Sequence, residues 1–529
     1  MKRKTLRSLS FLSIFVLSLV ACSAAFAATG SGEPKVFRYA YNFADLELLD
    51  VHKHTTNDVM QAANPLGEPL VRVDSEGTIH PLLLDALPEM SEDGTLFIFK
   101  LKEGIKFHDG TELRATDVEF TFNRIFDPKT QNLNTWLCDM IKGAPEMLEG
   151  KAPTLEGFKI IDDYSFSIEL SEPYAPFLSV LGCEQMMIYP KKACEEAGTH
   201  WGLTTFVGTG PFELVEFSSK EVMHAKRFKG YHGTPAKIDE LYIYVMDQGT
   251  ALMEYEVGNL DVVRVDNDVV ASYKTGDFAK NLVRVDLMGI IAMNMNVNMP
   301  PLNNVKVREA VSYAIDREGL LKSFLDGNGT PANCMIPPGI AAHVDRPYEY
   351  NPTKVKSLLA EAGYPDGVTI ESYVSETQEV AKVAVVLQEQ FKASNITLNV
   401  NRVDQGTYVD IRRAGQVQVP LLTWFKDISD PDNFTYTFYH STSSQLFSSN
   451  WKDAKTDEML ARGRASMGAE REKIYLELEN YLVEEQHIVA PLYNPVTYYL
   501  VADGVRGVIY DNSLLRFYEI DIAEIDIAK

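Results

Sequence analysis

Residues 105–118 read IKFHDGTELRATDV, and this stretch decides how the chain is interpreted. It follows an alternating run at residues 95–101, so we expect a strand that turns at Gly104 and continues through residues 105–107. The pair Asp109-Gly110 predicts a tight turn. Residues 116–119 have the spacing of a capping box, which predicts that a helix begins at Thr116. The stretch therefore combines a strand, a turn and a helix start.

Helices and strands alternate along the rest of the chain. Apolar residues at helical spacing predict a buried helix face formed by Val307, Ala310, Val311, Ala314 and Ile315. Further strands are expected at residues 35–41, 164–170, 396–400 and 488–493, and further helices at 354–362, 380–391 and 470–485. No repeat of fixed period is visible, so the pattern is typical of an α/β fold.

The N-terminus has the pattern of an export signal. A basic segment with Lys2, Arg3, Lys4 and Arg7 precedes a short apolar run at residues 9–21. Two cleavage sites compete. Residues 19–22, LVAC, resemble a lipobox that would make Cys22 the lipidated first residue, whereas Ala25-Phe26-Ala27 fits ordinary cleavage after residue 27. We favour the lipobox, and either site predicts a protein outside the cytoplasm.

Composition indicates a large globular protein of more than one domain. The 529 residues are 45% hydrophobic and 23% charged, which is more chain than one hydrophobic core accommodates. The formal net charge is −24, and removal of the basic leader would make it more negative. An acidic chain of this kind is a poor partner for nucleic acid or for anionic membrane surfaces.

Several further segments match one family in their order along the chain. Together with the opening stretch, they resemble the family 5 extracellular solute-binding proteins, the peptide- and nickel-type receptors of ABC importers. The matching segments are 207–212 (VGTGPF), 257–262 (VGNLDV), 305–317 (VKVREAVSYAIDR), 330–332 with 336–339 (TPA and IPPG), and 358–367 (LLAEAGYPDG).

The resemblance implies a two-lobed periplasmic-binding-protein type II fold with an extra subdomain inserted in lobe one. The solute would be enclosed when the lobes close. The expected boundaries are a signal peptide at 1–21, a tether at 22–34, lobe one from 35–57 plus 208–286 plus 493–529, the inserted subdomain at 58–207, and lobe two at 287–492.

The resemblance also suggests a ligand site at residues 423–434, TWFKDISDPDNF. In peptide-binding relatives the matching loop supplies an Asp that pairs with the N-terminal ammonium of the ligand, and here that role falls to Asp427. The alternative is that Asp427 only caps its own loop. Trp424 would wall the pocket or belong to the core. The backbone of Gly208, Thr209 and Gly210 would contact an extended ligand.

Other candidate ligand groups stay open. A peptide carboxylate would need a cation, and the candidates in lobe two are Arg308, Arg346, Arg402, Arg412 and Arg413. The segment Leu49-Asp50-Val51-His52 departs from the LDPH usual in the family, which leaves its turn geometry in doubt.

No metal or cofactor is predicted. Asp430 and Asp432 lack the Gly and Glu spacing of a calcium loop, and His108 is interpreted as a turn residue. Cys138, Cys183, Cys194 and Cys334 form no CxxC pair. In an oxidising compartment they could form disulfides, with Cys183–Cys194 the shortest closure, or they could stay as buried thiols.

Two classes of function remain. The first is a monomeric, non-enzymatic receptor that delivers short peptides to an ABC permease, with a lipid anchor if Cys22 is acylated. Within this class, nickel chelates, opines and oligosaccharides are alternative solutes. The second is an exported hydrolase, for which we find no HExxH, GxSxG or P-loop motif.

Overall fold

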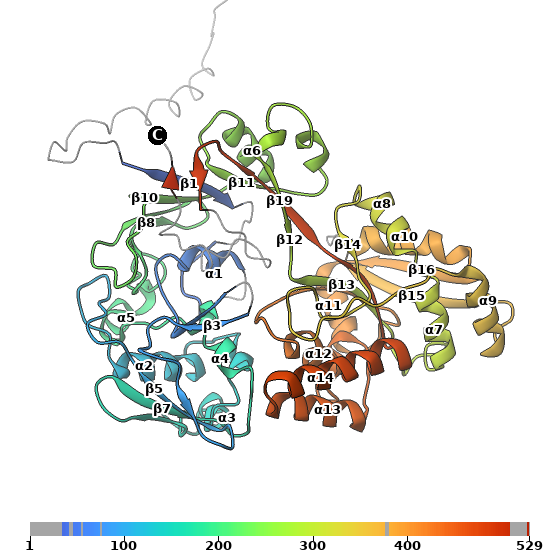
Figure 1. Ribbon diagram of the computed structural model, residues 1–529, viewed down its shortest axis with the longest axis horizontal. Coiled ribbons are helices and arrows are strands. Elements are labelled where there is room, and N and C mark those ends of the chain that lie inside the picture. Colours follow the sequence, from blue (N-terminus) through green and yellow to red (C-terminus); the bar gives the residue numbers. More distant parts are fainter. Residues whose placement is uncertain are drawn as a thin grey trace, which may run out of the picture. The chain divides into compact units, whose positions relative to one another are not determined.

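The computed structural model describes residues 34–41, 46–53, 57–74, 77–375, 380–507 and 526–527 (Figure 1). The predicted leader at 1–21, Cys22, the alternative cleavage site after residue 27 and all of the tether except Pro34 lie outside these residues. None of the described helices has both the length and the apolar character that a membrane crossing requires.

A seven-stranded mixed sheet contains both early and late segments of the chain. The strand at 35–41 is confirmed as β1 (Val36–Tyr41), which pairs in parallel with β10 (Glu240–Val245) and β11 (Val262–Val265). The other strands, all antiparallel to their neighbours, are β8 (Phe212–Ser218), β9 (Val222–Arg227), β12 (Leu282–Asp286) and β19 (Val496–Val501). Helix α6 (Gln248–Glu256) buries Ala251, Leu252 and Tyr255 against Val263 and Leu500 of the sheet.

A smaller antiparallel sheet has the order β4-β5-β7-β6 and a core of its own. Its strands are β4 (Glu89–Met90), β5 (Leu96–Lys100), β6 (Phe158–Ile160) and β7 (Ser165–Glu169). Phe99 and Phe158 each stack on Phe166, with centroid distances of 4.9 and 5.2 Å. Around this sheet and between it and β1 lie α1 (Asn57–Ala63), β2 (Val71–Val73), β3 (Ile79–Pro81), α2 (Ala115–Phe126), α3 (Ala144–Leu148), α4 (Phe177–Val180) and α5 (Lys191–Ala197).

The opening stretch folds differently from the prediction at two points. Residues 105–107 do not continue the strand, because only Lys106 forms a bridge, to Glu112, across the Asp109-Gly110 turn. The helix does not begin at Thr116. Its N-cap is Arg114, whose backbone N–H donates to Asp117 Oδ2 at 3.0 Å. The Asp117 carboxylate therefore fixes the start of α2 earlier than the capping-box pattern indicated.

The third part is built on a four-stranded sheet of order β14-β18-β13-β17. Its strands are β13 (Gly289–Asn294), β14 (Thr330–Pro331), β17 (Leu421–Phe425) and β18 (Val489–Asn494). The parallel pair β15 (Val368–Ser375) and β16 (Ile396–Val403) packs on α10 (Val380–Lys392). The other helices are α7 (Val305–Tyr313), α8 (Arg317–Phe324), α9 (Pro352–Glu361), α11 (Gln405–Arg413), α12 (Asp432–Tyr439), α13 (Ala454–Ala465) and α14 (Gly468–Glu479).

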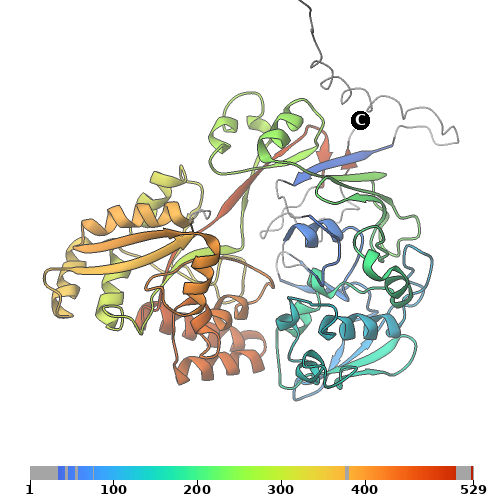
Figure 2. The same cartoon turned by 180° about the vertical axis from the view of Figure 1, so that it is seen from behind.

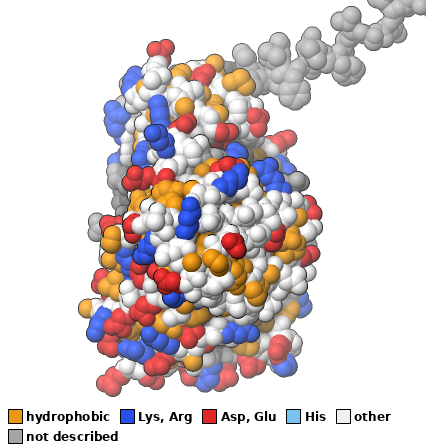
Figure 3. All heavy atoms as spheres, turned by 90° about the vertical axis from the view of Figure 1, so that its right-hand side faces the viewer, with side chains coloured by type: hydrophobic (Ala, Val, Ile, Leu, Met, Phe, Trp, Pro, Cys, Tyr) orange, Lys and Arg blue, Asp and Glu red, His pale blue; other side chains and the backbone are white. Residues whose placement is uncertain are grey.

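Most helix predictions in this part are confirmed. All five residues of the predicted face at 307–315 are fully buried. The helix expected at 470–485 is confirmed in extent, because α14 ends at Glu479 and continues directly as a π-helix, Asn480–Glu485. Figure 3 views this side of the molecule and shows acidic and basic side chains interspersed with apolar ones, without a large patch of one charge.

The chain passes between the seven-stranded and the four-stranded sheet at two places. Strand β12 leads into β13 through Leu287 and Met288, and β18 leads into β19 through Pro495. The two connections are adjacent, because the backbone N–H of Leu287 donates to the Pro495 carbonyl at 3.0 Å. They can be followed in Figures 1 and 2, where the long β12 and β19 run between the two sheets.

Candidate functional site

A cavity of about 620 Å³ lies where these connections meet β17. Leu287 and Pro495 of the connections line it, and Arg264 and Asn267 reach it from the end of β11. Strand β17 and helix α11 supply much of the remaining wall, with Thr423, Trp424, Phe425, Gln405, Tyr408 and Arg412. Both large sheets therefore contribute to one cavity, which is a common location for small-molecule sites.

Three buried polar atoms on the wall of this cavity have no hydrogen-bond partner among the described residues. They are the indole Nε1 of Trp424, the guanidinium Nε of Arg412 and the amide Oδ1 of Asn267. Buried polar groups are nearly always satisfied, since an unsatisfied one costs about 1–3 kcal/mol. A polar molecule bound in the cavity could form the missing hydrogen bonds with these two donors and one acceptor.

Trp424 is held in place by other aromatic rings. Its ring packs edge-on against Phe438, with a centroid distance of 5.1 Å, and against Phe447 at 5.8 Å. The side chain is half-buried, and β17 places it opposite Ile290 of β13. The rings fix the indole by packing while its N–H stays unpaired, so Trp424 belongs to the cavity wall as well as to the core.

Of the five candidate arginines, only Arg412 lines this cavity. Its guanidinium lies 4.6 Å from the centre of the Phe447 ring, and burial lowers its pKa. Arg308 is committed to the Leu302 and Gln486 carbonyls, and Arg346 to the buried carboxylate of Glu479. Arg402 and Arg413 are exposed.

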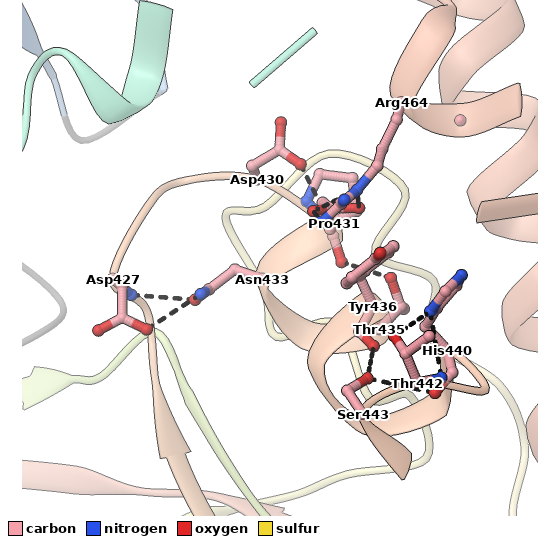
Figure 4. A network of polar contacts seen from close by, with 12 residues as sticks. Asp427, Asp430, Pro431, Asn433, Thr435, Tyr436, His440, Thr442, Ser443 and Arg464 are labelled. Carbon is pink, nitrogen blue, oxygen red and sulfur yellow. Dashed lines mark hydrogen bonds and ion pairs between the residues drawn. The ribbon is translucent and has the colours of Figure 1, made fainter. Parts of the chain in front are cut away.

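Asp427 lies two residues beyond β17 and is not among the residues that line the cavity. Its half-buried side chain faces Asn433 (Figure 4). The Asn433 amide donates to Asp427 Oδ2 at 3.0 Å, and Asn433 Oδ1 accepts from the Asp427 backbone N–H at 2.9 Å. Asp427 therefore braces its own loop.

The neighbouring acidic residues are used in ion pairs. The Asp432 carboxylate accepts hydrogen bonds from Nε and Nη2 of Arg464, with N···O distances of 2.8–3.1 Å. The Asp430 carboxylate accepts one from Nη2 of Arg471 at 2.7 Å. Burial raises the pKa of Asp430, and the Arg471 charge opposes that rise. These contacts account for both carboxylates, and no group of three or more potential metal ligands occurs among the described residues.

The segment Gly208-Thr209-Gly210 packs against His108 and residues 65–67. Gly208 N–H donates to His108 Nδ1 at 3.2 Å, so the ring proton is on Nε2, which donates to the Gly210 carbonyl at 3.0 Å. A Cβ on Gly208 would lie 2.1 Å from the Leu66 carbonyl oxygen, so only glycine fits there. The Thr209 hydroxyl is buried and has no hydrogen-bond partner in the part of the chain that the structure describes. His108 is a structural residue of this turn.

The atypical segment at 49–52 forms a buried polar cluster. Arg124 of α2 donates to both carboxylate oxygens of Asp50, at 3.1 and 2.5 Å, and to His52 Nδ1 at 2.7 Å. His52 Nε2 therefore carries the proton and donates to the Gln185 carbonyl at 3.1 Å. The segment forms a turn, with Lys53 N–H donating to the Asp50 carbonyl at 3.0 Å.

The four cysteines within the described residues are buried, and no disulfide joins any of them. Burial raises the pKa of Cys138, and it raises that of Cys194 to about 12. Cys183 Sγ lies 3.5 Å from the Asp427 carbonyl oxygen. The predicted option of a Cys183–Cys194 disulfide is not realised in this structure.

Sequence patterns did not mark Arg264 or Asn267 as site residues. Both follow the matched segment 257–262, but neither is part of it. Their position at the cavity depends on β11 lying next to β19 in the sheet, and that pairing joins segments far apart in the chain.

Comparisons with known proteins agree with this architecture. The chain is 28% identical to the Dipeptide-binding protein of Escherichia coli (strain K12) over 400 residues, which cover 72% of this chain and 74% of that protein. It is 27% identical to Heme-binding protein A of Haemophilus influenzae over 453 residues, or 81% of each chain. The solved structure of MppA, a periplasmic murein tripeptide binding protein in an unliganded open form, aligns with a TM-score of 0.81 at 22% identity. That alignment covers 94% of this chain and 98% of the other.

The structural match confirms the predicted two-lobed, type II binding-protein fold. The family model for bacterial extracellular solute-binding proteins, family 5 Middle, matches residues 78–445, well over half of the chain. The chain therefore belongs to the family 5 bacterial extracellular solute-binding proteins.

Proposed function

We propose that this protein is the receptor of an ABC importer that captures short peptides outside the cytoplasmic membrane and delivers them to a permease. Family membership supports the receptor role, and the relative named a dipeptide-binding protein supports the solute class. The observation that carries the proposal is the cavity beside β17, with three buried polar atoms that find no partner among the residues described.

A short peptide would supply the missing partners. Its carbonyls can accept from Trp424 Nε1, its amides can donate to Asn267 Oδ1, and its terminal carboxylate can pair with Arg412. Asp427 would receive the terminal ammonium at the end of β17, and the peptide's side chains would occupy the remaining volume. In the segment 208–210, the Thr209 hydroxyl would form a hydrogen bond with the bound peptide.

Recognition of both termini would make the receptor selective for free peptides over acylated ones. A ligand that covers the half-buried Asp427 carboxylate without supplying an ammonium would desolvate that charge with no ion pair to offset the cost, so we expect a ligand that lacks the amine to bind more weakly. Backbone contacts, in contrast, accept many side chains. This combination predicts a broad specificity for sequence and a narrow one for chain ends.

Native mass spectrometry of the purified protein, with released ligands sequenced, tests the proposal. We expect a set of di- to oligopeptide masses and binding of Ala-Ala, but not of N-acetyl-Ala-Ala, by calorimetry. A single non-peptide mass would contradict the peptide assignment. The family includes a relative named a heme-binding protein, so a Soret absorbance band in the purified protein would favour that solute instead.

We also propose that Cys22 is acylated and anchors a monomeric receptor near its permease. The lipobox-like segment LVAC at 19–22 supports this. The intact mass of the mature protein distinguishes a diacylglyceryl cysteine from a chain cleaved after residue 27.

A further inference from the structure

A second cavity, of about 310 Å³, lies beside the start of β18 and shares no lining residue with the cavity described above. Its walls come from the C-terminal end of α7, the start of α8, residues 347–349 and the segment 483–491. Neither the sequence motifs nor the proposed peptide site accounts for it.

Arg317 is the buried cation that lines this cavity. It is only 5% exposed, and its Nε donates to the Ala332 and Pro491 carbonyls at 2.8 and 2.7 Å. The Tyr348 ring lies on one side of the guanidinium, with its centre 5.1 Å from Cζ. No carboxylate of the described residues comes within 4.0 Å of the guanidinium. A buried cation without a carboxylate in direct contact is unusual, because burial without pairing is costly. The charge of Glu484, which also lines the cavity, acts on the guanidinium from beyond that distance.

The cavity also holds an unsatisfied imidazole. His487 has a left-handed backbone, with φ +48°, and its Nδ1 is buried without a partner in the described part of the chain. Burial, together with the nearby charges of Arg308 and Lys354, lowers the His487 pKa to about 4. The ring is therefore neutral at pH 7 and can donate one hydrogen bond to a bound group.

The remaining lining restricts the charge and shape of a ligand. Pro347, Val483, Val489, Ala490 and Pro491 give it an apolar wall, whereas Glu349 and Glu484 are exposed at its edge. One guanidinium and a neutral imidazole suit a single negative charge. The two glutamates would repel a dianion such as phosphate.

We propose that this cavity binds a small organic monocarboxylate, with the carboxylate on Arg317 and the apolar body against Pro347, Val489 and Pro491. The guanidinium presents its terminal N–H groups to the carboxylate, and His487 supplies a further donor. The site is separate from peptide capture and does not depend on the proposed function.

Phenylacetate is a suitable probe, and phenylacetamide is its neutral counterpart of the same shape. We expect phenylacetate to bind one-to-one in ligand-observed NMR titrations of the mature protein, and phenylacetamide to bind at least about tenfold more weakly, as loss of a charge-assisted contact predicts. Arg317→Gln should weaken phenylacetate binding by a similar factor.

Three further variants keep the test decisive if Arg317→Gln fails to fold. Ser312 is half-buried at the cavity and its hydroxyl bonds only to its own helix, so Ser312→Phe should fill the space and abolish binding. Arg412→Gln removes an arginine from the other cavity, and Arg402→Gln removes an exposed one. Both should leave binding unchanged. Absence of saturable binding, equal binding of the amide, or loss of binding on Arg412→Gln would overturn the proposal.

Discussion

At the scale of single residues, Asp427 has one role that is visible and one that is proposed. Its carboxylate braces the loop through Asn433, which agrees with the alternative that it caps its own loop. The same bracing orients the carboxylate, and a group held in one conformation costs less to order when a ligand arrives. The loop contact therefore does not compete with a role in ligand binding.

Asp427→Asn separates the two roles. The amide keeps an oxygen that can accept from Asn433 but loses the charge that would pair with an ammonium. We expect thermal stability to be unchanged and affinity for Ala-Ala to fall by about 2 kcal/mol or more, roughly thirtyfold, in calorimetry. Asp410→Asn, at an exposed position of α11 outside the cavity, is the matched control. Wild-type affinity in Asp427→Asn would exclude the amine-anchor role.

Arg412→Gln tests the other end of the peptide. The variant should lose affinity for Ala-Ala but bind Ala-Ala-amide as well as the wild type does, because the amide has no carboxylate to pair. The measurement is the ratio of the two dissociation constants. An equal loss for both peptides would indicate that Arg412 supports the wall without contacting the carboxylate.

The sequence motif points to Trp424, which lines the cavity, but the set of residues around that cavity could not be predicted. The motif identifies Trp424 by its position along the chain, but it does not say which distant residues pack beside it. Which of five arginines faces the cavity depends on the packing of α11 against β17, and four of the five prove to be committed elsewhere or exposed. Asn267 carried no local signal.

At the scale of elements, the segment at 49–52 shows how a departure from a family pattern is accommodated. The turn is held by side chains: Asp50 and His52 converge on Arg124, and the Tyr189 hydroxyl accepts from the Val51 N–H at 3.1 Å. This cluster ties α2 to the segment that follows β1. Removing Asp50 or Arg124 would leave the charge of the other buried without its ion-pair partner.

The cluster makes stability depend on pH through His52. Burial, followed by the Arg124 charge, lowers its pKa to about 3, against an ordinary value of about 6.5 in the unfolded chain. The contribution of neutral His52 to the free energy of unfolding is complete above pH 6.5. It is lost as the pH falls from 6.5 toward 3, because in that range only the unfolded state takes up the proton. The expected slope is about 1.4 kcal/mol per pH unit.

His52→Asn, which keeps an acceptor for Arg124, should remove this dependence. Between pH 7 and pH 5 the free energy of unfolding in urea should fall by about 2 kcal/mol less in the variant than in the wild type. His200→Asn, at an exposed position, should follow the wild type. Parallel pH profiles for His52→Asn and wild type would show that His52 is not the titrating group.

Element prediction succeeded where periodicity was long and failed at ends. The face at 307–315 and the strand–helix order from α10 to β16 follow directly from apolar spacing. The start of α2 depends on one hydrogen bond between Asp117 and Arg114, and the change from α- to π-helical geometry after Glu479 was not predicted. Local contacts of this kind leave no periodic signal.

At the scale of the whole molecule, the segment at 58–207 contacts the part built on the four-stranded sheet. Ala175 N–H donates to the Arg464 carbonyl at 2.8 Å, and the Arg464 guanidinium lies 5.0 Å from the centre of the Tyr174 ring. Cys183 Sγ approaches the carbonyl of Asp427, the proposed amine anchor. These contacts join segments that the chain links only through two short connections.

Solute capture in two-lobed binding proteins proceeds by closure about such connections. Cys183, only 3% exposed, should therefore react with a thiol reagent only when its contact with the 427 loop opens. A peptide that binds the closed state reduces the open population by mass action. At a concentration 100 times its dissociation constant, the expected reduction in the modification rate is up to about a hundredfold.

Mass spectrometry of N-ethylmaleimide labelling measures this rate at each cysteine separately. Cys334 is 1% exposed in the core around Met335 and Ile336 and serves as an internal control, since local opening at the 427 loop does not uncover it. Ala-Ala should protect Cys183 and leave Cys334 unchanged, and N-acetyl-Ala-Ala should protect neither. Equal protection of both thiols would indicate general stabilisation by the ligand, and no protection of Cys183 would mean that this contact takes no part in closure.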